Sequence, residues 1–160
     1  MSIISKEIKA TGFIRLFGLK KVPLIFYCRP SVIKLTDETT IIKIPFKRRN
    51  RNHLRSMYFG SLAVGADVAS GVLAMDLIRK SGRNVSLVFK DFKADFLKRA
   101  EGDTLFTCND GKAIQSLINE TITSGERVYM PVKITATVPS KFGEEPVAEF
   151  VLTLSLKLKS

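Results

Sequence analysis

The sequence has few cysteines, and this scarcity excludes two ways of stabilising a small protein. Cys28 and Cys108 are its only cysteines, too few for a disulfide scaffold or a zinc site. No apolar run reaches the roughly 18 residues of a membrane-spanning helix, and the N-terminus lacks the apolar block and cleavage site of a signal peptide. No segment is compositionally biased and 45% of the residues are hydrophobic, which argues against wholesale disorder. We expect a soluble, cytoplasmic protein with free thiols.

Acidic residues are also in the minority. There are 15 of them against 26 basic residues, a formal net charge of +11, which favours phosphates, nucleic acid or an acidic membrane surface as partners. The positive charge is densest at Lys47, Arg48, Arg49 and Arg51. No helix-turn-helix or RNA-binding signature accompanies this cluster, so nucleic acid is not expected. The cluster suits a phosphorylated small molecule equally well, and a solvated loop is the alternative.

The longest apolar pattern spans residues 58–80. Apolar residues recur there at helical spacing, proline is absent, and Ser81-Gly82 predicts the end of the helix. One carboxylate, Asp67, lies in the middle of this pattern. Because an unpaired buried charge is costly, Asp67 must be paired, neutralised or used in chemistry. Asp76, near the helix end, is expected to be solvated or to act as a cap.

The other elements follow from apolar periodicity. A change in the parity of apolar residues near Lys90 and Asp91 predicts a β-bulge that bends its strand. The strands have one apolar face, which predicts an α+β fold: an antiparallel sheet packed on the central helix, in a single domain over residues 1–160. We predict helices at 2–21 and 110–124, the latter with Asp110 as N-cap, irregular chain at 22–35 with a short strand at 31–35, further strands at 39–46, 85–96, 103–108, 130–138 and 148–158, and a hairpin loop at 139–146.

The N-terminal helix is predicted to be amphipathic and basic. Its apolar residues, among them Ile8, Phe13 and Leu16, alternate with lysines and an arginine. Such a helix can lie on a membrane surface, but more often it docks on its own domain. Membrane association is therefore not favoured.

A curved antiparallel sheet around one buried helix resembles the hotdog fold, and the residues before the helix sharpen this resemblance. Hotdog thioesterases of the phenylacetyl-CoA type carry Asn-x-x-Gly-x-x-His-Gly-Gly before the helix and a catalytic Asp seven residues after the last Gly. Asn52, Gly60 and Asp67 match the Asn, the final Gly and the Asp at this spacing. The chain resembles still more closely an uncharacterised thioesterase-like hotdog family.

The resemblance covers about residues 31–158 and leaves the N-terminal helix outside the hotdog core. The motif departs from the family at three positions, its first Gly, its His and its middle Gly, which are here Arg55, Tyr58 and Phe59. The loop is therefore bulkier than in the family.

The resemblance implies an acyl-CoA thioesterase. Asp67 would be the general base for water or a direct nucleophile, with a pKa raised by burial. The N–H groups of Phe59 and Gly60, at a helix N-terminus, would stabilise a developing oxyanion. Asn52 would orient the attacking water or the motif loop, while Tyr58 and Phe59 would pack or line the acyl pocket.

The spacing of Gly60 and Asp67 predicts a dimer. Seven helical residues separate them by roughly 10 Å, too far for both to touch one carbonyl. A two-fold dimer with antiparallel central helices would bring the Asp67 of one subunit near the Gly60 of the other, and the resemblance implies the same arrangement. We expect a homodimer, which could pair into a tetramer. Arg48, Arg49 and Arg51 would then hold the phosphates of CoA, which is part of the substrate; no other cofactor and no metal are expected.

Two other functions remain open. The bulky residues in the motif favour a non-catalytic hotdog module that binds an acyl-CoA or a lipid. The net charge alone favours a nucleic-acid or membrane-surface binder, which ranks last because no recognition element is readable.

Overall fold

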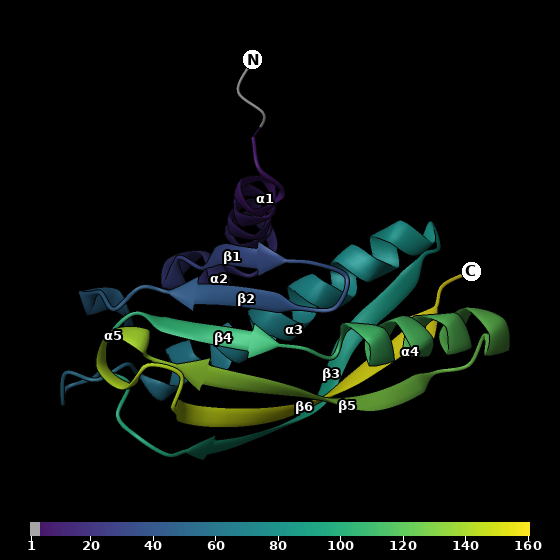
Figure 1. The fold of residues 1–160 in the computed structure, drawn as a ribbon. Coiled ribbons are helices and arrows are strands. Elements are labelled where there is room, and N and C mark those ends of the chain that lie inside the picture. Colours follow the sequence, from purple (N-terminus) through teal and green to yellow (C-terminus); the bar gives the residue numbers. More distant parts are fainter. Residues whose placement is uncertain (1–3) are drawn as a thin grey trace.

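The protein is built on one six-stranded antiparallel sheet, which a computed structural model describes within residues 4–160 (Figure 1). The strand order is β1-β2-β4-β5-β6-β3, and every neighbouring pair is antiparallel. Each strand lies where apolar periodicity predicts one. The strands are β1 (Ser31–Leu35), β2 (Thr40–Ile44), β3 (Val85–Phe96), β4 (Thr104–Cys108), β5 (Val128–Thr137) and β6 (Pro146–Leu158).

The long helix α3 (Phe59–Ser81) packs on the sheet against β2, β4 and β5. Small residues let it approach closely: a Cβ on Gly65 would lie 2.3 Å from the buried ring of Phe106. Gly82, with φ of 68°, ends the helix in the left-handed conformation, as predicted. α3 is long and apolar enough to cross a membrane, although its sequence contains no uninterrupted apolar run of that length. However, 78% of its most apolar stretch is buried inside the protein, as in the core helix of a globular domain.

The edge strand β3 is bent. Its register with β6 shifts between Phe89 and Phe92, which confirms the predicted bulge. Within residues 4–160, β3 pairs with β6 alone, so its other edge is open there. The predicted architecture, a curved antiparallel sheet wrapped around one long helix, is confirmed.

Some segments predicted as irregular are short helices. Residues 22–30 contain α2 (Pro23–Cys28), the basic cluster contains η1 (Arg48–Asn50), and the predicted hairpin loop contains α5 (Pro139–Phe142). Two of these helices start on a proline, whose missing N–H is not needed in a first turn. These two short helices were not predicted because their proline residues are also typical of turns and loops.

The two remaining helices were predicted, with differences in detail. α1 is Lys6–Lys21; residues 2 and 3 of the predicted range lie outside the described residues. α1 docks against α2 and β1. α4 is Gly111–Ser124, but the Asp110 carboxylate does not cap it: Oδ2 accepts a hydrogen bond from the Lys133 N–H of β5 at 2.7 Å.

Candidate active site

The loop before α3 is organised by the side chain of Asn52. Its Oδ1 accepts hydrogen bonds from the backbone N–H groups of Leu54 and Ser56 at 2.9 and 3.1 Å, and its Nδ2 donates to Ser56 Oγ at 3.0 Å. Asn52 thus satisfies the backbone of its own loop, as a turn residue does. Arg55 has φ of 59°. This left-handed conformation is the reason why a glycine suits the same position of the family motif.

Asn50, which we did not single out from the sequence, connects this loop to the core. Its side chain is fully buried, and Nδ2 donates to the carbonyls of Cys28 and Pro45 at 3.1 and 3.0 Å. Its Oδ1 accepts from Ser61 Oγ in α3 at 3.1 Å, and its carbonyl accepts from the Tyr58 N–H at 2.8 Å. In the sequence it looks like one more polar residue of a basic loop.

The N-terminus of α3 has no side-chain cap. Tyr58 occupies the N-cap position without a capping hydrogen bond, and the Leu62 N–H, which bonds to the Tyr58 carbonyl, is the first engaged in the helix. Among the residues that the structure describes, the N–H groups of Phe59 and Gly60 have no acceptor, so they can bind an anion. However, the Tyr58 ring covers Gly60 so closely that a Cβ on Gly60 would lie 2.4 Å from it. Tyr58 therefore fills the space beside Gly60 on the side where a Cβ would lie.

Asp67 is half-buried in the middle of α3. Within residues 4–160, no donor lies within hydrogen-bond or ion-pair distance of its carboxylate, and burial raises the pKa of this group. The predicted direction of the pKa shift and its cause are thus both found. Asp67 is an acid that the fold leaves unpaired, the situation in which a carboxylate can act as a base.

Asp76, on the same helix, is of the opposite kind. We expected it to be solvated or capping, but its side chain is 8% exposed and forms ion pairs with Lys6, Arg79 and Lys80 at 3.3, 2.8 and 3.1 Å. Desolvation raises the pKa of Asp76, but hydrogen bonds from these three cations outweigh it, so that the net shift is downward. Asp76 is therefore structural: it ties α1 to the end of α3.

A cavity of about 370 Å³ lies beside the start of α3. It combines apolar residues with two cations, Lys98 and Arg99, that sequence reasoning did not single out. Neither Asp67 nor Gly60 is among its lining residues. The lining residues are Asn52, Ser56, Met57, Phe59, Leu62, Phe96, Leu97, Lys98, Arg99 and Ala100.

The predicted site residues fall into three groups in one chain. Asn52 and Phe59 meet at the cavity, whereas Asp67 stands apart on α3. The basic cluster does not line the cavity, although Arg48 and Arg49 are exposed. Arg51 is engaged locally: its guanidinium lies 4.4 Å from the Phe46 ring centroid and donates to the Phe46 carbonyl at 3.1 Å.

Solved structures with the same fold include several named as thioesterases. A protein of unknown function from Pseudomonas aeruginosa, described as a probable thioesterase, is 23% identical with a TM-score of 0.75 over 93% of this chain and 96% of that one. A thioesterase family protein from Silicibacter pomeroyi is 17% identical, with a TM-score of 0.67 over 94% and 99% of the two chains. A thioesterase from Staphylococcus aureus, solved as a single-residue variant, is 13% identical, with a TM-score of 0.63 over 84% and 98%.

At these identities the likeness shows the fold, a hotdog fold of the kind found in thioesterases. No curated protein matches the chain. A family model does match, over residues 11–153, and so covers the sheet, the motif loop and α3. The chain therefore belongs to the family described as a domain of unknown function, DUF4442.

Proposed function

We propose that the protein hydrolyses acyl-CoA thioesters, with Asp67 as the general base or nucleophile. The observation that carries the proposal is the carboxylate of Asp67, which burial disfavours as an anion and which no donor within residues 4–160 compensates. A carboxylate of raised pKa is a stronger base toward water than an ordinary surface acid. The uncapped N-terminus of α3 supplies N–H groups for the developing oxyanion.

The proposed site needs two copies of the chain. Asp67 lies two helical turns from Gly60, roughly 10 Å along the axis, and does not line the cavity beside the helix start. A two-fold axis that sets two α3 helices antiparallel places the Asp67 of one protomer opposite the α3 N-terminus of its partner. Each dimer then contains two composite sites.

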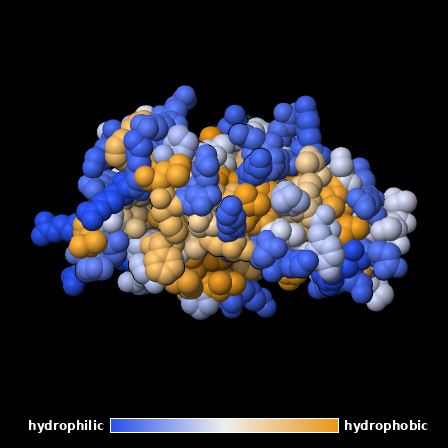
Figure 2. Space-filling view, turned by 90° about the horizontal axis from the view of Figure 1, so that it is seen from below, coloured by the Kyte–Doolittle hydropathy of each residue, from blue (hydrophilic) through white to orange (hydrophobic). Residues whose placement is uncertain are grey.

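An exposed aromatic cluster supports this dimer. Phe59 and Phe96 lie 6.5 Å apart between ring centroids and are 61% and 53% exposed, and Phe92, on the same edge strand, is 44% exposed. Figure 2 looks at the molecule from below and shows an apolar band across the middle of this face, bordered by hydrophilic side chains. A contiguous apolar surface next to an open strand edge is typical of an interface. Sedimentation as a monomer at micromolar concentration would rule out the composite site.

The reaction is tested with a panel of short, medium and aromatic acyl-CoAs, by following the release of free thiol. We expect turnover that Asp67→Asn lowers by about 10²–10⁴-fold, the usual contribution of a positioned base. Glu120→Gln, which alters an exposed acid on α4, serves as the matched control and should keep full turnover. Equal turnover of Asp67→Asn and the parent protein would refute the proposal.

A non-catalytic acyl-CoA-binding or lipid-binding module is the second candidate. The bulky residues Arg55, Tyr58 and Phe59 in the motif loop favour it, and the Tyr58 ring lies against Gly60. Tight binding of acyl-CoA without thiol release would establish this alternative. Tyr58→His, which restores the family residue, should then create or increase turnover if the ring is the obstacle.

Two sets of cations are candidates for binding the CoA phosphates. Arg48 and Arg49 are exposed on η1, while Lys98 and Arg99 line the cavity. We propose that Arg48 and Arg49 reach the phosphates across the dimer. Replacing both with Ala should weaken acyl-CoA binding in a salt-dependent way; an unchanged affinity at low salt, with a loss on replacing Lys98 and Arg99, would assign the phosphates to the cavity.

A further inference from the structure

The helix α1 is apolar on both of its faces. Only Ile14 and Gly18 are fully buried, with Ala10 and Phe17 packed partly on the core. The apolar residues that we predicted as a docking face point away from the core. The side chains of Ile8, Phe13, Leu16 and Leu19 are 50 to 63% exposed, and those of Leu24 and Tyr27 on α2 are 58% and 54% exposed. We call these six residues the apolar face of α1 and α2.

Scattered exposed hydrophobic residues are normal, but a row of them on one helix is not. Positions 8, 12, 16 and 19 follow one another at helical spacing along the side of α1 opposite Ile14 and Gly18. Gly12 in this row meets no atom within 4 Å of its ideal Cβ position. Within residues 4–160, nothing covers this row of side chains.

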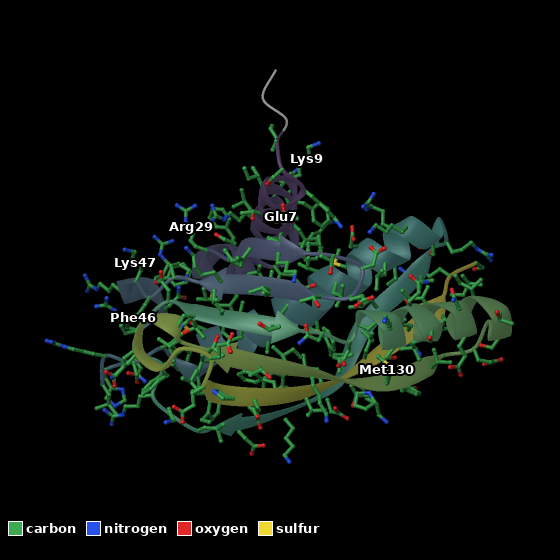
Figure 3. The ribbon with its side chains drawn as sticks, in the orientation of Figure 1. Glu7, Lys9, Arg29, Phe46, Lys47 and Met130 are labelled. Carbon is green, nitrogen blue, oxygen red and sulfur yellow. The ribbon has the colours of Figure 1, made fainter. Side chains whose placement is uncertain are left out.

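Cations lie on the same segments as the apolar face and next to them. Helix α1 carries Lys9, Lys20 and Lys21 as exposed residues, and Glu7 is its only acid. Arg29 follows α2, and the Arg49 guanidinium lies 5.8 Å from the centroid of the Tyr27 ring. In Figure 3, Lys9, Arg29 and Lys47 lie on the upper and left sides of the molecule, from α1 to the segment before η1. The exposed apolar residues and the cations thus lie on the same two helices and the segments next to them.

We propose that the apolar face of α1 and α2 is a docking surface for an anionic lipid membrane. Apolar side chains that enter the headgroup region, with lysines and arginines set beside them, are the features by which a helix binds such a surface. A protein partner would need a matching acidic groove, whereas a membrane needs only positive charge and exposed apolar side chains. Acyl chains released or consumed by the proposed reaction also partition into membranes, but the docking proposal does not depend on that reaction.

The position of α1 separates this surface from the proposed dimer interface. α1 packs on β1, at one edge of the sheet, whereas the aromatic cluster lies on β3, at the opposite edge, and on the first residue of α3 (Figure 1). A dimer formed through β3 therefore leaves the apolar face of α1 and α2 free. The same protein can be dimeric and bound to a membrane.

The test measures co-sedimentation of the full chain with vesicles that contain phosphatidylglycerol, against vesicles of phosphatidylcholine alone. We expect binding to the anionic vesicles that weakens with added salt. Phe13→Ser with Leu16→Ser should lower the partition coefficient roughly tenfold or more, because each side chain loses its apolar contact. Lys9→Gln and Lys20→Gln should each lower it about fivefold.

Controls separate membrane docking from loss of charge or of the fold. Lys157→Gln with Lys159→Gln removes two charges near the C-terminus, away from α1 (Figure 1), and should change the partition coefficient far less. All variants should keep the circular dichroism of the parent and its rate of acyl-CoA hydrolysis in solution. Equal binding of the Phe13 and Leu16 variant would overturn the proposal. A smaller assembly in sedimentation for that variant would also overturn it, since a second copy would then cover this face.

Discussion

Two carboxylates on α3 have opposite surroundings, and their pKa values are therefore shifted in opposite directions. Asp67 is half-buried and has no donor within residues 4–160, whereas Asp76 accepts hydrogen bonds from three cations. From the sequence, the two acids, nine residues apart on one apolar helix, differ in their place along the helix and in the motif match of Asp67. Their difference arises from residues that only the fold brings near, such as Lys6 beside Asp76. The match to the family motif identified Asp67; nothing in the sequence identified the role of Asp76.

The raised pKa of Asp67 predicts that increasing pH raises the rate of hydrolysis and lowers the stability of the fold. Because the ionised form is the base, the rate of thioester hydrolysis should rise with pH through the raised pKa. Ionisation is harder in the folded state than in the unfolded one, so Asp67 lowers stability as pH rises through its folded pKa. Asp67→Asn should therefore be more stable than the parent at neutral pH, with the difference vanishing below the usual pKa range of a carboxyl. Urea unfolding at several pH values measures this, and a less stable variant at neutral pH would contradict it.

The buried hydrogen bonds of Asn50 predict that its substitution lowers stability, although Asn50 has no proposed role in the reaction. Asn50→Ala leaves the buried Cys28 carbonyl and the buried Ser61 hydroxyl without this partner, while the Pro45 carbonyl keeps the Lys47 N–H. We expect the free energy of unfolding to fall by about 2–4 kcal/mol, since each buried group left unsatisfied costs about 1–3 kcal/mol. Asn109→Ala, which removes one exposed hydrogen bond, should cost less than about 1 kcal/mol. Chemical denaturation compares the two, and equal losses would show that the buried position of Asn50 is unimportant.

At the scale of elements, apolar periodicity predicts the long strands, α3 and α4 because these elements have one face on the core. It even places the bulge in β3, where the parity of apolar residues changes. It fails for α2 and α5, which are too short for a period and begin on Pro23 and Pro139. It misjudges α1, whose exposed face is as apolar as its buried one. The exposed apolar residues of α1 thus break the rule that apolar residues mark the core.

The contact between α3 and the sheet predicts an unequal effect of two alanine substitutions. A Cβ at Gly65 would lie 2.3 Å from the Phe106 ring, which is fully buried and cannot move aside. Gly65→Ala should therefore cost about 1–3 kcal/mol of unfolding free energy through overpacking. Gly12→Ala, in open space on α1, should gain about 0.5–1 kcal/mol from helix propensity. Urea midpoints measure both, and a tolerated Gly65→Ala would mean that α3 is not held tightly on the sheet.

The ion cluster around Asp76 joins two elements and predicts a loss of stability in acid. Its lowered pKa means that the ionised carboxylate stabilises the folded state above the unfolded pKa, and that this contribution is lost as pH falls through the folded pKa. Asp76→Asn should lower the unfolding free energy at neutral pH by about 1–3 kcal/mol, the range for hydrogen bonds to charged groups. The two proteins should become equally stable in acid. A constant difference from neutral to acid pH, measured by thermal unfolding, would contradict this assignment.

At the scale of the whole molecule, the proposed reaction requires a dimer, because one chain does not bring the proposed catalytic groups together. If each site combines the Asp67 of one protomer with the α3 N-terminus of its partner, two inactive variants should complement each other. Asp67→Asn removes the base, and Gly60→Val blocks the approach to the helix N-terminus. Random mixing gives half of the dimers one chain of each kind, and each of these has one intact site, so co-expression should restore about a quarter of the parental thiol release. Each variant alone should stay inactive. A mixture as inactive as its components would refute the composite site. Asp67 and Gly60 would then not act on the same carbonyl at all, because within one chain the helix holds them too far apart.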